Sequence, residues 1–175
     1  MSESSRFTVA VHSLCWLELA RRRGVESLTS EAVAASLLAN PALLRRTLGE
    51  LRRAGIVQAE RGPGGGWRLL VAADDLTLDR VRDAVDDRAR FGLHAHAPNQ
   101  ECPVGFGIAS PLSELFGEVD DAVSRVLTRR TVAEVLDAAL AESAAAGVSE
   151  TRSGNRLRPW RSSTRRPRSP RPSAS

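Results

Sequence analysis

The stretch ERGPGGGWRLL, from Glu60 to Leu70, constrains this chain most, because it places four glycines and one proline in five consecutive positions. Glycine loses more conformational entropy on folding than any other residue, so such a cluster needs a structural reason. A phosphate-binding loop needs a helix start after its glycines, whereas here the apolar segment WRLLVA follows. A linker does not suit two apolar segments this close together. The pattern predicts a β-hairpin in which residues 56–61 pair with residues 67–71 and the glycines form the bend.

Three helices are predicted before this hairpin. Residues 6–22 carry apolar side chains at helical spacing and end before Gly24. A short helix follows a cap at Thr29 or Ser30 and ends near residues 36–39. A third runs from Pro41 to Arg53 behind the cap Asn40, with Gly55 after its end. Two short helices joined by a tight turn form a helix-turn-helix, and the hairpin after them completes a winged helix.

The third of these helices has two different faces. At 100° per residue, Leu44, Leu48 and Leu51 share one face, which suits a core. The opposite face is small and cationic, with Ala42, Arg46, Gly49 and Arg53 at its centre and Arg45 and Arg52 at its edges. Small residues allow a partner to approach the backbone, and arginines can reach phosphates or guanine edges. Arg61 and Arg68 are further phosphate candidates on the hairpin. An ordinary solvated helix face is the alternative interpretation.

Further helices and a long loop are predicted beyond the hairpin. Thr77 can cap a helix over residues 78–88, and a loop rich in glycine, proline and histidine follows it. Pro111 opens a long helix to about Thr128, whose apolar surface is wider than a single stripe. Because so small a chain cannot bury that whole surface, we predict that this helix packs on a second copy. Thr131 caps a last helix.

The predicted fold class is mainly α with a small β-hairpin wing. We expect a winged helix-turn-helix DNA-binding domain over residues 1–75 and a dimerisation and sensor region with the long helix over residues 76–142. Residues 143–175 are rich in Arg, Pro and Ser, and we expect this tail to be disordered. The tail can add non-specific phosphate affinity or be dispensable.

Charge is divided unevenly between the tail and the rest of the chain. From residue 152 onward there are eight arginines and no acidic residue. Removing them from the 25 basic and 21 acidic residues leaves 17 basic residues against 21 acidic ones. DNA binding by the body therefore requires a local arginine cluster. Every basic residue is Arg, which excludes a P-loop lysine and a Schiff-base lysine.

The expected location is the bacterial cytoplasm, in association with the nucleoid through DNA. The N-terminus lacks the pattern of a signal peptide, and no apolar run has the length of a membrane span. Two cysteines, Cys15 and Cys102, do not make a disulfide framework. The partners that we expect are a second copy of this chain, through the long helix, and double-stranded DNA, through the arginine face. We expect no membrane association.

Several phrases together resemble the Rrf2-type transcriptional regulators, a family of bacterial winged-helix repressors that includes iron–sulfur-cluster, nitric-oxide and cysteine-metabolism regulators. They are SRFTVAVHSLCWLELA, LTSEAVAASLLANPALLRRTLGELRRAGIV, ERGPGGGWRLL, LTLDRVRDAV, CPVG and TVAEVL, in this order. The resemblance implies a dimer, joined by the long helix, on a pseudo-palindromic operator. It also implies that Ser30, Ala42, Arg45 and Arg46 face the major groove, that Gly64, Gly65 and the wing arginines meet the minor groove, and that Arg6 touches the DNA backbone.

The candidate DNA-binding residues comprise this set, the helix caps Thr29 and Asn40, and Arg53 of the third helix. They are Arg6, Thr29, Ser30, Asn40, Ala42, Arg45, Arg46, Arg53, Arg61, Gly64, Gly65 and Arg68.

The cysteines separate this chain from the cluster-binding members of the family that it resembles. Those members carry three closely spaced cysteines before the long helix, and this chain has Cys102 alone there. The pattern is similar to the cluster-free branch, so we predict no cofactor. Cys102 is the first sensor candidate, by oxidation or alkylation, and Cys15 the second, as a residue that we expect inside the first helix. His94, His96, Cys102 and His12 are weaker metal candidates.

We predict a sequence-specific, DNA-binding transcriptional regulator that acts as a dimeric repressor and has thiol oxidation as a candidate signal. An enzyme is not expected, because no serine lies in a nucleophile elbow and adjacent aspartates on a helix point apart. An iron–sulfur or metal-ligated redox-sensing regulator remains an alternative. So does a winged-helix module that binds protein and not DNA.

Overall fold

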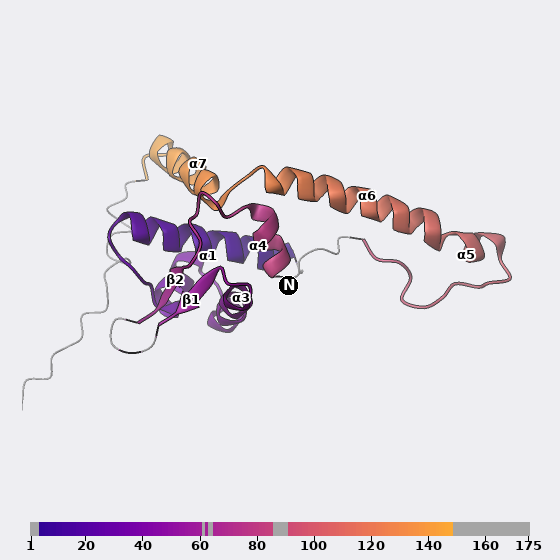
Figure 1. Ribbon diagram of the computed structural model, residues 1–175, viewed down its shortest axis with the longest axis horizontal. Helices are drawn as coiled ribbons and strands as arrows, with labels where there is room; N and C mark the ends of the chain where they lie inside the picture. The colour runs from indigo at the N-terminus through magenta and orange to yellow at the C-terminus, as the bar shows by residue number, and fades with distance from the viewer. Residues whose placement is uncertain (1–3, 61, 63–64, 86–90, 149–175) are drawn as a thin grey trace, which may run out of the picture.

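The computed structural model describes residues 4–60, 62, 65–85 and 91–148. It contains seven helices and one two-stranded sheet in these ranges (Figure 1). The helices are α1 (Ser4–Arg22), α2 (Ser30–Leu37), α3 (Pro41–Arg53), α4 (Leu78–Ala84), α5 (Pro103–Gly107), α6 (Ala109–Thr128) and α7 (Val132–Ala145). The strands β1 (Val57–Ala59) and β2 (Trp67–Leu69) lie between α3 and α4.

The predicted fold class is confirmed, with corrections at several boundaries. The hairpin pairs antiparallel, with Val57 opposite Leu69 and Ala59 opposite Trp67, so each strand is shorter than predicted. The loop predicted before the long helix contains the short helix α5, and α6 begins at Ala109, two residues before Pro111. The last helix, α7, continues to Ala145, so residues 143–145 are helical and not part of a disordered tail. The predicted helix over 78–88 ends at Ala84, and residues 86–90 lie outside the described residues.

The core is built around α1. This helix packs against α2, α3, α4, α7 and β2, and Leu14 at its centre is completely buried. Leu44, Leu48 and Leu51 of α3 are also completely buried, which confirms the face predicted from their spacing. Fully burying a leucine side chain is worth about 1.5–3 kcal/mol, so these leucines fix which side of α3 faces outward.

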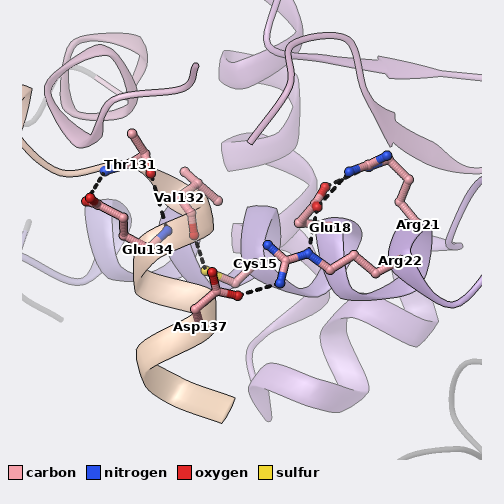
Figure 2. A network of polar contacts seen from close by, with 8 residues as sticks. All are labelled: Cys15, Glu18, Arg21, Arg22, Thr131, Val132, Glu134 and Asp137. Atoms are coloured by element: carbon pink, nitrogen blue, oxygen red, sulfur yellow. Dashed lines mark hydrogen bonds and ion pairs between the residues drawn. The ribbon is translucent and has the colours of Figure 1, made fainter. Parts of the chain in front are cut away.

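A buried carboxylate joins α1 to α7. Glu18 has no exposed surface and accepts hydrogen bonds from Arg21 Nε and Nη2 at 2.8 Å and from Arg22 Nε at 2.9 Å. Arg22 also pairs with Asp137 of α7 (Figure 2). The hydrogen bond from Arg21 is the main cause that lowers the pKa of Glu18, and burial acts in the opposite direction. Two guanidinium groups therefore keep this buried carboxylate charged.

The long helix α6 extends away from the rest of the molecule, with α5 at its far end (Figure 1). None of its residues is buried, and Leu115 and Val126 are 50% and 63% exposed. Phe116 on α6 stacks with Phe91 at a centroid distance of 5.3 Å. The apolar surface predicted for this helix is thus largely uncovered in one chain. No helix of the described ranges is both long enough and apolar enough for a membrane span.

Candidate nucleic-acid interface

The start of α3 is fixed by its cap. The Oδ1 atom of Asn40 accepts a hydrogen bond from Ala42 N at 2.8 Å, and proline occupies the first turn, as predicted. The end is set by Gly55, whose φ of +69° is a left-handed conformation that glycine adopts without strain. Both ends were predictable because each needs a particular residue type.

The outward face of α3 carries the predicted cationic surface. Ala42, Arg45, Arg46, Arg52 and Arg53 are exposed, and Gly49 is half-buried. The pair between Arg46 Nε and Glu50 Oε1 is 3.3 Å long, with 71% of the Arg46 side chain exposed. Because only 10% of the Glu50 side chain is exposed, this is a half-buried pair, and Arg46 must leave Glu50 to contact a phosphate.

The turn between α2 and α3 contains an unusual backbone conformation. Leu38 has φ +48° and ψ +33°, which is left-handed, and its side chain is 91% exposed. For a residue with a Cβ atom this conformation costs about 1–2 kcal/mol. Its N–H donates to Ala34 O, which ends α2 and lets α3 leave in a new direction. No residue type near Leu38 predicts this strain, because glycine or asparagine is the usual residue at such a position.

The hairpin supplies part of the predicted wing. Gly62 has φ +99°, and its carbonyl accepts from Gly65 N at 2.9 Å, so glycine forms the described part of the bend. Arg68 Nε lies 2.7 Å from Glu60 Oε1 across the hairpin, and this hydrogen bond lowers the pKa of Glu60. The candidates Arg61 and Gly64 lie outside the described residues.

A connection that we did not predict joins the hairpin to the start of α2. Leu28 and Trp67 exchange two backbone hydrogen bonds, of 3.0 and 2.7 Å, and Trp67 Nε1 donates to Ser30 Oγ at 2.9 Å. The hydroxyl of Ser30 can still donate its own hydrogen to a phosphate. Thr29 accepts from Ala32 N at 3.2 Å as the cap of α2. These bonds hold the hairpin and the helix-turn-helix as one unit.

The remaining candidates lie away from this unit or take structural roles. Arg6 lies in the first turns of α1 and is half-buried. Cys15 is buried, as expected, and its Sγ donates to Val132 O at 3.7 Å (Figure 2). Burial raises the pKa of Cys15 to about 11, so this thiol stays protonated. Cys102 is exposed and directly precedes α5.

The chain matches the model of the Rrf2 family, described as iron-dependent transcriptional regulators, over residues 3–138. This protein belongs to the Rrf2 family. It is 30% identical over 134 residues to YwnA of Bacillus subtilis (strain 168), which is named as an HTH-type transcriptional regulator, and the match covers 77% of this chain and 96% of that protein. The family and its named members are transcriptional regulators and not enzymes.

Two solved structures have a similar fold. One, described as a DNA-binding protein, is 29% identical and has a TM-score of 0.58, covering 75% of this chain and 98% of that one. The other, IscR from T. potens, is 19% identical with a TM-score of 0.57 and covers 79% of this chain and 88% of that one. At 19% identity, the likeness to IscR concerns the fold alone.

The iron dependence in the family description can be tested against the ligands of this Rrf2 protein. In the described ranges, no three His, Cys, Asp or Glu side chains come together as metal ligands, and His94, His96, Cys102 and His12 form no such group. Cys15 is held as a neutral thiol against a carbonyl, and burial lowers the pKa of His12. Three thiolates cannot come from two cysteines. The residues of one chain therefore do not fit an iron–sulfur cluster.

Proposed function

We propose that this Rrf2-family regulator is a dimeric, sequence-specific repressor that acts in the bacterial cytoplasm, with α3 in the major groove and the hairpin tip at the minor groove. The observation that carries the proposal is the outward face of α3. It presents four exposed arginines around Ala42 and Gly49, while the buried leucines hold the opposite face in the core. An α-helix fits the major groove of B-DNA, and arginine is the commonest specific partner of guanine there.

The proposed dimer uses α6 as its contact surface. Two copies that pack along α6 would cover apolar side chains such as Leu115 and Val126, which a single chain leaves exposed. A 20-residue helix is about 30 Å long. This length is close to the separation of about 34 Å between half-sites one helical turn apart. A pseudo-palindromic operator is the DNA counterpart of such a dimer.

Selection of duplexes from a random library tests sequence-specific binding directly. We expect the wild-type protein to enrich a pseudo-palindromic motif, and the Arg45→Ala/Arg46→Ala double variant to lose it. Arg129→Ala is the matched control, because Arg129 is an exposed arginine at the end of α6 and far from α3 in sequence. A wild-type protein that enriches no duplex would favour the protein-interaction alternative. A reporter gene placed behind the motif then tests repression.

A second candidate function is a response to thiol oxidation at Cys102. The observation that favours it is the contrast between the exposed Cys102 and the buried, protonated Cys15. Peroxide would oxidise two Cys102 thiols to a disulfide between two copies and be reduced to water. We expect oxidant to change operator affinity in the wild type and not in Cys102→Ser. Equal affinity with and without oxidant in the wild type would refute this function.

A further inference from the structure

Arg82 forms a buried ionic cluster between α4 and α6. It is only 4% exposed, and its Nη1 lies 2.9 Å from Asp120 Oδ1 on α6. Its Nη2 donates to Ser124 Oγ on α6 at 2.7 Å and lies 3.1 Å from Asp79 Oδ1 on α4. Ser124 Oγ in turn donates to Asp79 Oδ1 at 3.1 Å. One buried guanidinium thus bonds to two successive turns of α6.

This cluster is the second of two polar attachments between α6 and the DNA-binding unit, by which we mean helices α1 to α4 and the hairpin, since α4 packs against α1 and α3. The first is at the C-terminal end of α6, where Leu78 N donates to Arg130 O at 2.9 Å and Val132 N donates to Leu76 O at 3.0 Å. One attachment alone would act as a pivot. The Arg82 cluster holds α6 one to two turns further along, so the two together define the direction of the helix. Within one chain, Leu127 of α6 also packs against the core near the first attachment, and no residue of α6 is buried.

We propose that Arg82 is a specificity-determining residue. By holding α6 at a fixed angle to the DNA-binding unit, it sets the separation of half-sites that the dimer accepts. This inference rests on the proposed function, in which α6 joins two copies on DNA.

The length of α6 makes its angle consequential. Without the cluster, α6 would pivot at its C-terminal attachment, and from Thr128 to Ala109 the helix rises 19 residues, or about 28 Å at 1.5 Å per residue. A rotation of about 7° at this pivot moves the far end by about 3.4 Å, which is one base-pair step. Modest angular freedom at Arg82 is therefore enough to let the two DNA-binding units fit half-sites one base pair closer or further apart.

Methionine at position 82 tests the inference, because it keeps much of the volume and removes the charge. Asp79 and Asp120 keep 20% and 34% of their side chains exposed, so both carboxylates can be hydrated when the arginine is absent. Arg80→Met is the matched control, since Arg80 lies on the same helix with an exposed side chain. Asp120→Asn is a second variant that weakens the contact to α6 and leaves Arg82 paired with Asp79.

The assay measures affinity for duplexes that carry two copies of the selected half-site at separations varied in single base pairs around one helical turn. We expect the preference for the best separation over its neighbours to fall by about tenfold in Arg82→Met. Arg80→Met should keep the wild-type preference, and binding to a single half-site should be unchanged in both variants. Sedimentation should show that both remain dimers.

The outcomes separate this inference from the proposed function. A folded Arg82→Met dimer with the wild-type preference overturns the inference and leaves the proposed function intact. If circular dichroism shows that Arg82→Met does not fold, the same comparison on Asp120→Asn decides. A wild-type protein that is monomeric, or that binds no duplex, refutes the proposed function and the inference with it.

Discussion

Gly66 lies where the hairpin meets the start of α2, and replacing it with alanine tests that junction. A Cβ atom on Gly66 would lie 2.5 Å from Leu28 O and 2.7 Å from Leu28 C. Both are backbone atoms, so they cannot move aside as a flexible side chain would. The backbone of Gly66 is not left-handed, so the contact with Leu28 is the source of the strain.

The expected cost follows from the bonds that this contact would break. The junction holds two backbone hydrogen bonds between Leu28 and Trp67 and the indole bond from Trp67 to Ser30. At a net value of about 1 kcal/mol each, their loss lowers the free energy of unfolding by about 3 kcal/mol. For a protein of this size the midpoint of thermal unfolding should fall by about 10 °C.

Thermal and urea unfolding followed by circular dichroism measure this effect. Gly117→Ala is the control, because Gly117 lies within α6 with no atom within 4 Å of an added Cβ. Alanine there should raise stability by about 0.5–1 kcal/mol. If Gly66→Ala unfolds at the wild-type temperature, the junction between the hairpin and α2 does not hold the wing as described.

Three further predictions concern single side chains. Glu18→Gln should lower the free energy of unfolding by about 3 kcal/mol at pH 7, as measured by urea titration. Because folding lowers the pKa of Glu18, the stabilisation from its charge is lost as the pH falls. The difference in stability between wild type and variant should therefore shrink below pH 4.5. Leu38→Gly should stabilise the protein by about 1 kcal/mol in the same titration, since it relieves the left-handed strain, and a loss of stability would contradict this. In the folded protein, maleimide should label Cys102 and not Cys15, as mass spectrometry of the intact chain and its peptides can establish.

Local chemistry explains why much of this fold could be predicted. Asn40, Thr77 and Thr131 each cap the helix that follows, because a side-chain oxygen satisfies free backbone N–H groups wherever it lies. The leucines of α3 repeat at helical spacing. The glycines after β1 are followed by a second apolar segment, which favours a hairpin over a phosphate-binding loop or a linker. Each signal lies within a few residues of the feature that it determines.

The unpredicted features depend on contacts between distant parts of the chain. Arg82 and Asp120 are 38 residues apart, and nothing near either residue indicates the other. The bridge between Leu28 and Trp67 likewise joins two residues that are far apart in the sequence. The helix α5 has only five residues and lies in a segment rich in glycine and proline, where helix propensity is low. The DNA-binding roles of the outward residues of α3 stay a prediction, since exposure alone does not name a partner.

The salt dependence of binding to the selected duplex tests most directly whether the arginine face of α3 contacts DNA. Each phosphate contact contributes about one unit to the slope of log K against log salt concentration. We predict a steep slope for the wild type and a slope about two units shallower for Arg45→Ala/Arg46→Ala, with that of Arg129→Ala unchanged. Equal slopes and equal affinities for wild type and the double variant would contradict the account.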